Sequence, residues 1–334
     1  MKTAECVSPK HPDKMCDQIS DAILDHLLKQ DPKARVAVET MGGHGKVAIM
    51  GEITAHLGIT PEEIKNIVHR ITGENEEVFI NLVEQSPEIS RGVDIDGAGD
   101  QGIMVGYACT DNDDMIPHEL FLARSLCKFI YEKHPFDGKT QITLDNDNKI
   151  TSIVASFGKT KSEEIRELIT DWYAQLGMDP EMIKGFDIFA NPAGDWNQCG
   201  FEADTGLTGR KIAVDCYGPQ IPIGGGAFSG KDCTKVDRSG AYMARKIARD
   251  TMIQFQAKEC TVKLAYAIGI PHPVMATAFV TNGQGIVSEH AITGEGRGKY
   301  LAPGAIRDFL KLDQPIYEET AKWGHFGQGF AWDR

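Results

Sequence analysis

The sequence predicts an α+β protein. Short strands that read as hairpins alternate along the chain with amphipathic helices, and this mixture is typical of layered α+β domains. The chain has 334 residues, long enough for two or three domains and a substantial core. Apolar residues make up 41% of the composition and charged residues 25%, as in an ordinary globular protein.

The first third of the chain alternates helix, hairpin, helix and strand. Pro12 suits the first position of a helix, and Asp31-Pro32 ends the apolar stripe that follows it. Thr60 and Glu63 form a capping box before a second stripe. The predicted elements are a helix from 11 to about 28, a hairpin of strands 35–40 and 46–54, a helix over 60–71 and a strand over 78–84.

The remaining elements follow from the same periodicities. The acidic turn at 145–148 is too short for an EF-hand loop, so we interpret it as a hairpin turn. The predicted elements are a strand over 102–109, a helix over 119–131, a hairpin of strands 140–144 and 149–155, a helix from 162, strands over 187–190 and 212–215, a helix over 236–256, strands over 261–268 and 274–281, and a short helix over 306–310.

Charge and cysteine usage exclude several classes of function. The net charge of −13 argues against non-specific binding to nucleic acids or to anionic membranes. No apolar run is long enough to span a bilayer, and the N-terminus lacks the apolar core of a signal peptide. The eight cysteines are scattered without a C-x-x-C pair, so we expect reduced thiols and a cytoplasmic protein.

One glycine-rich stretch carries the strongest chemical signal. It reads Gly224-Gly225-Gly226-Ala227-Phe228-Ser229-Gly230-Lys231-Asp232, and Lys235 and Asp237 follow at once. Glycines let backbone N–H groups approach a ligand, lysines suit phosphate oxygens, and carboxylates suit Mg²⁺. The stretch nearly matches a P-loop, but Asp232 stands where a P-loop has Ser or Thr. The alternative interpretation of this stretch is a glycine-rich surface turn without a ligand. The clustered charges favour a phosphate site.

Other segments add ligand-type residues. His11, Asp13 and Lys14 lie at a predicted helix N-terminus, where free N–H groups favour anions. Glu39 and Glu52 lie on the predicted hairpin, where such residues are either solvated or line a site. The segment 90–102 is rich in glycine and aspartate, as are loops that move over a ligand.

Together these segments resemble the S-adenosylmethionine synthetase (methionine adenosyltransferase) family. The resemblance runs nearly end to end and in order, and the glycine stretch is its most specific part. The segments that carry it are Glu5 with His11-Pro12-Asp13-Lys14; Glu39-Thr40 with Gly51-Glu52-Ile53-Thr54; Gln85-Ser86-Pro87 with 97–102; Gly206-Leu207-Thr208-Gly209-Arg210-Lys211; 224–237; and Gly324-His325-Phe326-Gly327.

The resemblance implies a fold and a reaction. The fold is three similar α/β-layered domains with pseudo-threefold symmetry, interleaved in the chain, with approximate divisions at 1–98, 99–199 and 200–334. The sulfur of L-methionine, or of a close S-alkyl analogue, attacks ribose C5′ of ATP and expels triphosphate, which is then hydrolysed to phosphate and diphosphate. Mg²⁺ and K⁺ are required. The enzyme is a homodimer or a dimer of dimers, with active sites at the subunit interface.

The resemblance also implies roles for individual residues. His11, Lys139, Asp204, Arg210 and Lys231 carry the chemistry. Contacts to ATP are expected from His11, Asp100, Asp137, Lys139, Trp196, Arg210, Lys211, Ala227 and Lys231. Methionine is expected to contact Glu52, Gln85, Asp204 and Lys235. Asp13 and Asp237 are the expected Mg²⁺ ligands, and Glu39 is the expected K⁺ ligand.

Three features depart from the family pattern. The loop from Gln85 to Asp100 is several residues shorter than usual, which predicts altered closure or a wider substrate range. Asp195-Trp196 stands in place of Arg-Phe, so Trp196 is the expected adenine-stacking ring. Pro9-Lys10 replaces the usual Glu-Gly.

Three other classes of function stay open at this point. They are a P-loop-like kinase, a non-enzymatic regulatory subunit of the same family, and a structural interaction protein. A kinase would release ADP from ATP, whereas a synthetase would release none.

Overall fold

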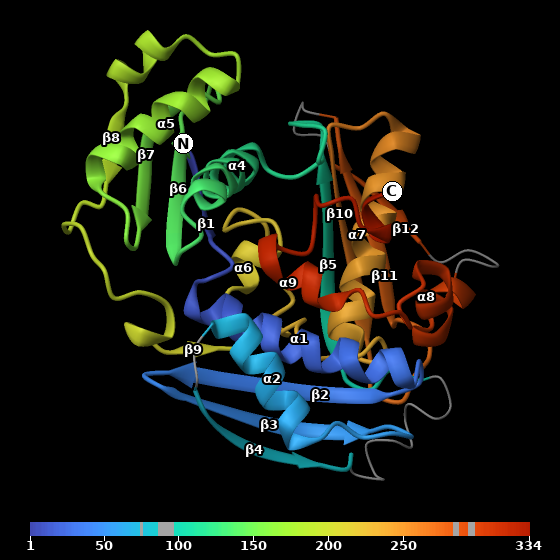
Figure 1. Cartoon of the computed structure of the whole chain (residues 1–334). Coiled ribbons are helices and arrows are strands. Elements are labelled where there is room, and N and C mark those ends of the chain that lie inside the picture. The colour runs from blue at the N-terminus through green and yellow to red at the C-terminus, as the bar shows by residue number, and fades with distance from the viewer. Residues whose placement is uncertain (74–75, 86–96, 283–286, 293–297) are drawn as a thin grey trace.

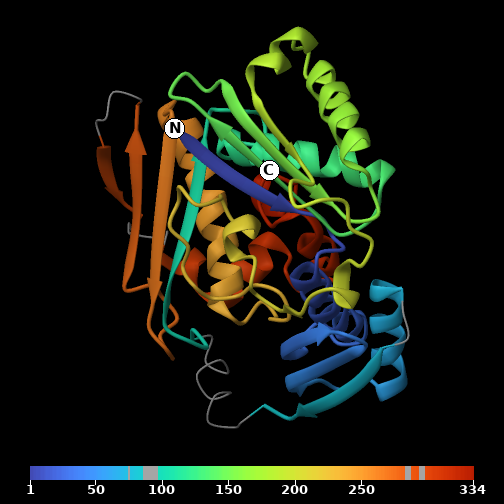
Figure 2. The ribbon, with the colours of Figure 1, turned by 90° about the vertical axis from the view of Figure 1, so that its left-hand side faces the viewer.

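The computed structural model describes residues 1–73, 76–85, 97–282, 287–292 and 298–334. In this part of the chain, the strands form three four-stranded sheets, and helices pack against each of them (Figure 1). The view in Figure 2 shows the same three units from the side. The predicted α+β class is therefore confirmed.

The first sheet has the order β4-β3-β2-β9. The predicted hairpin is present, and its turn residues His44 and Gly45 have φ of +54° and +79°. β4 extends the sheet parallel to β3, and β9 comes from about 160 residues further along the chain than β2, with which it pairs. The elements are α1 (Pro12–Gln30), β2 (Arg35–Gly43), β3 (Lys46–Thr54), α2 (Pro61–Thr72), β4 (Glu77–Val83) and β9 (Gly206–Leu207).

The second sheet has the order β1-β6-β7-β8. Its inner face packs on two helices around Trp172, whose side chain is buried. The first strand comes from the N-terminus of the chain and was not predicted. The elements are β1 (Lys2–Val7), α4 (His118–Lys133), β6 (Gly138–Leu144), β7 (Ile150–Phe157), α5 (Ser162–Gln175), the 3₁₀ helix η1 (Pro180–Gly185) and β8 (Asp187–Ala190).

The third sheet has the order β12-β11-β10-β5. Its central helix, α7, packs closely on β5 because a Cβ on Gly106 would lie 2.1 Å from the backbone of Ala244. The elements are β5 (Gly102–Cys109), α7 (Val236–Phe255), β10 (Glu259–Tyr266), β11 (Met275–Thr281), β12 (Val287–Ala291) and α8 (Pro303–Leu310).

Short segments fill the space between the three units. α6 (Ile212–Asp215) and α9 (Tyr317–Trp323) lie near the centre of the view in Figure 1, and α9 packs along α1. The C-terminal segment is buried: Trp332 stacks on Tyr242 with ring centroids 3.6 Å apart. The remaining 3₁₀ helices are η2 (Gly200–Glu202), η3 (Gly298–Leu301) and η4 (Ala331–Asp333).

The predicted strand over 212–215 was wrong. Its β-branched residues favour a strand, but this segment forms the single helical turn α6, in which the N–H of Asp215 donates to the carbonyl of Lys211 at 2.8 Å. The buried ammonium of Lys14 bonds the side chain of Asp215, and this tertiary contact overrides the local preference.

Each sheet takes a strand from a distant part of the chain: β1, β5 and β9 pair with strands of the second, third and first sheets. The three similar units are thus interleaved, as expected. The linear divisions at 98 and 199 stay a prediction. The shortened loop is also untested, because residues 86–96 lie outside the described part of the chain.

Candidate active site

The N-terminus of α1 holds the first group of candidate residues. His11 is the N-cap, and its Nδ1 accepts the N–H of Asp13 at 3.2 Å. Pro12 occupies the first helical position, where a missing N–H has no cost. Asp13 is 2% exposed, and its Oδ1 accepts the N–H of Leu207 at 2.9 Å. This contact ties the helix start to the segment that carries Arg210 and Lys211.

Two cations approach Asp13 from that segment. Lys211 Nζ lies 2.5 Å from Asp13 Oδ2, and Arg210 Nε lies 3.6 Å from Oδ1. Burial alone would raise the pKa of Asp13, but bonds from Lys211 and from the N–H of Leu207 hold it below its usual value. Asp13 is therefore an anion at neutral pH, with a cation already beside it.

Three more predicted residues border this group. Asp137 is buried before β6, and its Oδ2 accepts the N–H of Gly200 at 3.1 Å. Burial raises the pKa of Asp137 to about 6. Lys139 and Asp204 are more open, and the charges of both act on His11. We call His11, Asp13, Asp137, Lys139, Asp204, Arg210 and Lys211 the helix-start group.

Burial and the neighbouring ammonium of Lys211 lower the pKa of His11 to about 4. The imidazole is therefore neutral at neutral pH. Because Nδ1 accepts a hydrogen bond from Asp13, the ring proton lies on Nε2. Nε2 can donate one hydrogen bond to an anionic ligand.

The glycine stretch packs along β2. The N–H of Val38 donates to the carbonyl of Gly230 at 3.0 Å, and the N–H of Asp232 donates to the carbonyl of Val36 at 3.1 Å. The Asp232 carboxylate also accepts the N–H of Val36 at 2.7 Å. A Cβ on Gly230 would lie 1.9 Å from the carbonyl oxygen of Val38, so only glycine fits. The stretch is thus an anchored turn rather than a loose surface connector.

The end of this stretch forms the second group. Lys231 Nζ lies 2.7 Å from Asp237 Oδ2, and the ammonium of Lys235 bonds Asp232. A Cβ on Gly226 would lie 2.2 Å from the carboxylate carbon of Asp237. We call Ala227, Lys231, Lys235 and Asp237 the glycine-turn group.

The two groups approach each other at one point. A Cβ on Gly209, beside Arg210, would lie 2.5 Å from the Cβ of Ala227. Within the described residues, no hydrogen bond or ion pair joins the charged side chains of one group to those of the other. One chain therefore carries the candidate site residues in two separate groups.

The remaining candidates lie at the outer face of the first sheet and near β5. Glu52 pairs in register with Ala37, and Ala37 bridges to Lys231 on its other side. Glu52 and Lys231 thus flank Ala37 about 10 Å apart, at the usual strand spacing. Glu39 is exposed on the same face. Gln85 follows β4, and its Oε1 is buried without a hydrogen-bond partner in the described structure; exposed Asp100 precedes β5.

The outer face of this sheet is apolar and open. Pairing registers place five large apolar side chains on it together with Glu39. Their exposed fractions are 53% for Met41, 48% for Met50, 57% for Phe79, 55% for Val83 and 37% for Leu207. An exposed apolar patch of this kind usually marks an interaction surface.

The substituted residues Asp195 and Trp196 have separate structural roles. Asp195 Oδ1 accepts the N–H of Ser162 at 2.9 Å and so caps the start of α5. Trp196 is half-buried and packs against Gly158. The reversed charge therefore serves the start of the helix.

The segment Pro9-Lys10 is also built into the fold. The carbonyl of Pro9 accepts a hydrogen bond from Gln18 Nε2 at 2.6 Å, and Lys10 Nζ donates to the carbonyl of Ile71 at 2.6 Å. The substitution thus ties the entry of α1 to the last turn of α2.

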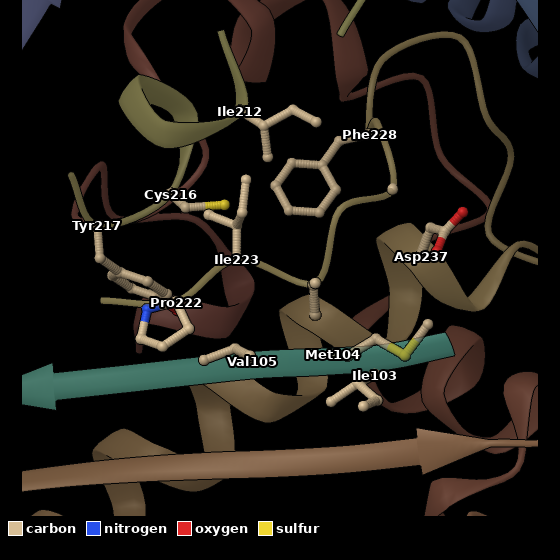
Figure 3. Close-up of a pocket in the computed structure, with 13 residues that line it drawn as sticks. Ile103, Met104, Val105, Ile212, Cys216, Tyr217, Pro222, Ile223, Phe228 and Asp237 are labelled. Atoms are coloured by element: carbon tan, nitrogen blue, oxygen red, sulfur yellow. The ribbon is translucent and has the colours of Figure 1, made fainter. Parts of the chain in front are cut away.

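Two hollows adjoin these groups. A cavity of only about 10 Å³ lies under the glycine stretch, lined mainly by apolar side chains with Asp237 at one end (Figure 3). It is too small for a nucleotide. A cavity of about 230 Å³ opens beside Asp137, with Lys10, Lys159 and Cys199 in its wall.

Sequence reasoning missed one feature of α1. Asp17, Asp21 and Asp25 continue from Asp13 at intervals of four residues, and all four carboxylates are at most 7% exposed. The four-residue spacing was visible in the sequence. Its meaning was hidden because a row of acids usually marks a solvated helix face.

Comparison with known proteins extends over the whole chain. Models of the S-adenosylmethionine synthetase N-terminal, central and C-terminal domains match residues 1–89, 95–196 and 199–334. S-adenosylmethionine synthase of Parvibaculum lavamentivorans is 39% identical over 370 positions, covering 99% of this chain and 95% of that protein. The synthase of Wolinella succinogenes is 40% identical over 367 positions, with the same coverage. These alignments exceed 334 positions, so parts of each relative have no counterpart here.

A solved structure agrees with these matches. An unusual S-adenosylmethionine synthetase from Campylobacter jejuni matches with a TM-score of 0.85 and 33% identity, covering 100% of this chain and 96% of that one. Fold and sequence therefore define a transferase that uses a nucleotide. The chain belongs to the S-adenosylmethionine synthetase family, the methionine adenosyltransferases that form S-adenosylmethionine from ATP and L-methionine. The P-loop, regulatory-subunit and structural-protein alternatives are set aside.

Among the described residues, no helix is both long and apolar enough to cross a membrane.

Proposed function

We propose that this chain forms S-adenosylmethionine in active sites that two copies share. The sulfur of L-methionine attacks ribose C5′ of ATP, the C5′–O bond breaks, and the same site hydrolyses the triphosphate to diphosphate and phosphate. The observation that carries the proposal is the presence of two lysine–aspartate pairs, Lys211 with Asp13 and Lys231 with Asp237, in two separate groups of a chain that matches the family throughout.

The triphosphate is the natural ligand of the cations. A neutral thioether is a poor nucleophile, so catalysis depends on stabilising the charge of the leaving group. Arg210, Lys211 and Lys139 from one copy would contact the triphosphate together with Lys231 from the second copy. Arg210 is exposed and its Nε is 3.6 Å from Asp13, so its side chain can turn to a ligand.

His11 acts as a neutral hydrogen-bond donor in this proposal. Its Nε2–H would reach the oxygen that leaves C5′, where negative charge develops during the displacement. Because the imidazole is neutral at neutral pH, Nε2–H can donate without a change of protonation state. The hydrogen bond that Nδ1 accepts from the N–H of Asp13 fixes the orientation of the ring.

The methionine and the adenosine would occupy opposite sides of the reacting centre. Glu52, Gln85, Asp204 and Lys235 would hold the amino acid. The buried Oε1 of Gln85 suits an ammonium donor. Asp100, Asp137, Ala227 and Trp196 would border the nucleoside. Holding sulfur, carbon and leaving oxygen in line supplies much of the rate acceleration.

The residues present suit the two cations that the family implies. Asp13 and Asp237 each offer a carboxylate beside a phosphate-binding lysine, and Mg²⁺ in nucleotide sites is commonly held by one or two carboxylates plus phosphate oxygens. Glu39 offers an exposed carboxylate for K⁺. The metal ions, when bound, supply neutralisation of triphosphate charge.

The open face of the first sheet supports a shared site. Met41, Met50 and Phe79 would be covered by a second copy, and Glu39 and Glu52 lie on this same face. Docking there would bring the glycine-turn group of one copy toward the helix-start group of the other, in a homodimer or a dimer of dimers.

The thiols support the expected cytoplasmic location. All eight cysteines are free, as is usual for proteins of a reducing compartment.

Product analysis tests the reaction. The purified chain is incubated with ATP, L-methionine, Mg²⁺ and K⁺, and the products are identified by mass spectrometry. The expected products are S-adenosylmethionine, diphosphate and phosphate, without ADP. Formation of ADP would contradict the proposal.

A further inference from the structure

Two glycine turns share nearly the same positive φ angle. Gly209 and Gly230 have φ of +79° and +80°. Each directly precedes a proposed triphosphate cation, Arg210 in one case and Lys231 in the other. These glycines are 21 positions apart in sequence, on different segments, so the likeness is not a matter of local sequence alone.

Both turns have the same kind of anchor. The N–H of Gly209 donates to Asp17 Oδ1 at 2.8 Å, and the N–H of Gly230 donates to Asp21 Oδ1 at 2.8 Å. Asp17 and Asp21 are four residues apart on α1 and are both 0% exposed. One helix face therefore fixes both turns.

Each of these carboxylates also has a buried cation. Lys14 Nζ lies 3.0 Å from Asp17, and Arg238 bonds Asp21 through both oxygens at 2.6 and 2.8 Å. Buried carboxylates that are paired and fully hydrogen-bonded hold their rotamers firmly.

Neither turn can relax easily. A Cβ on Gly209 would lie 2.5 Å from the Cβ of Ala227, and one on Gly230 would meet the Val38 carbonyl. A turn at positive φ, packed on one side and hydrogen-bonded through its N–H on the other, sets the direction of the next side chain.

We propose that Asp17 and Asp21 are positioning residues that aim Arg210 and Lys231 at the triphosphate by fixing the N–H groups of Gly209 and Gly230. This inference rests on the proposed function only in naming the triphosphate as the target. Neither carboxylate touches substrate, and each acts through the turn that it anchors.

Asp25 offers a matched control on the same helix. It is 7% exposed and accepts the N–H of Tyr317 at 3.0 Å and that of Glu318 at 2.9 Å. It therefore resembles Asp17 in being buried and in accepting a backbone N–H, but it anchors α9 rather than a segment with a candidate cation.

The test compares Asp17→Leu, Asp17→Asn and Asp25→Leu in the full-length enzyme. Asp17→Leu removes the acceptor while keeping the number and branching of the side-chain heavy atoms, and Lys14 keeps Asp215 as its partner. We expect kcat for S-adenosylmethionine formation to fall about 100-fold, as for a misplacement of about 1 Å, with little change in the KM for methionine. Asp17→Asn keeps an oxygen acceptor and should restore kcat to within about threefold of wild type. Asp25→Leu should lower Tm and leave kcat unchanged.

Two outcomes would overturn the inference. One is wild-type kcat in folded Asp17→Leu. The other is an equal loss of kcat in Asp17→Leu and Asp25→Leu, which would make the role purely structural.

Hydrogen exchange provides a readout that is independent of activity, and its first part needs no variant. In the wild-type protein, the amides of Gly209 and Gly230 should be protected, and exchange within seconds at either would overturn the anchor. Asp17→Leu should speed exchange in peptides covering 206–215 but not in those covering 228–236.

Arg210→Met separates failure of this inference from failure of the proposed function. Full activity in that variant would remove Arg210 from the proposed site while leaving the Gly209 anchor to be judged by exchange.

Discussion

Lys231 Nζ lies 2.7 Å from Oδ2 of Asp237, so a proposed triphosphate cation and a proposed Mg²⁺ ligand neutralise each other. The pair of Lys211 with Asp13 repeats the arrangement at 2.5 Å. When the lysine of such a pair binds polyphosphate, the carboxylate is free to bind Mg²⁺. When the carboxylate binds Mg²⁺, the lysine is free to bind polyphosphate. Nucleotide and Mg²⁺ should therefore bind as a unit rather than one after the other.

This coupling can be measured. We expect the affinity for a non-hydrolysable ATP analogue to fall at least about tenfold when Mg²⁺ is replaced by EDTA. Isothermal titration in both conditions gives the ratio. Asp237→Asn serves as the control, because it removes one metal ligand and should shrink the ratio. Equal affinities with and without Mg²⁺ in the wild-type protein would refute the coupling.

Gly226 is predicted to be essential for the position of Asp237. In Gly226→Ala, the added Cβ would lie 2.2 Å from the carboxylate carbon, so Asp237 must move. A displacement of about 1 Å at a reacting centre lowers kcat/KM on the order of 100-fold. Gly185→Ala is the control, because nothing lies within 4 Å of its added Cβ. Similar kinetics for the two variants would show that Asp237 does not need its present position.

Variants of Asp195 and Trp196 should affect different properties, stability in the first case and nucleotide binding in the second. Asp195→Ala removes the hydrogen-bond acceptor at the start of α5 and should lower the thermal stability slightly without changing ATP affinity. Trp196→Ala should weaken ATP binding, because it removes the proposed stacking ring. Thermal unfolding and titration of both variants check the pair. Unchanged ATP affinity in Trp196→Ala would exclude stacking.

Asp25 should make stability depend on pH. Burial raises its pKa from 3.8 to about 6, so between these values the folded state binds more protons than the unfolded state. The titration of Asp25 should therefore remove about 2 to 3 kcal/mol from the free energy of unfolding of the wild type as pH rises from 4 to 6.5. Asp25→Asn lacks this loss. Denaturant unfolding of both proteins at one fixed protein concentration measures their free energies of unfolding. The difference between the two free energies should grow from pH 4 to 6.5, and a constant difference would contradict the prediction.

Local patterns in the sequence predicted most helices and hairpins, because their apolar periodicity is continuous. They failed where long-range contacts decide the structure. The segment 212–215 has a strand-like composition but is held as a helical turn by Lys14. The two-residue strand β9 is a strand only through its pairing with Met41 and Gly42 of β2.

The candidate site shows the same limit. The charged motifs could be read from the chain, since phosphate chemistry needs those residue types. The pairing of Lys211 with Asp13 joins residues almost 200 positions apart, and no local pattern indicates it. The anchors at Asp17 and Asp21 were hidden in a helix that reads as amphipathic.

The sharing of each active site between two copies is tested most directly by mixing two inactive variants. Lys211→Met disables the helix-start group, and Lys231→Met disables the glycine-turn group. After the two proteins are unfolded together and refolded, half of the dimers should be mixed, and each mixed dimer should hold one intact site. We expect recovery of about a quarter of wild-type S-adenosylmethionine formation. No recovery, despite mixed dimers confirmed by mass, would show that each site lies within a single chain.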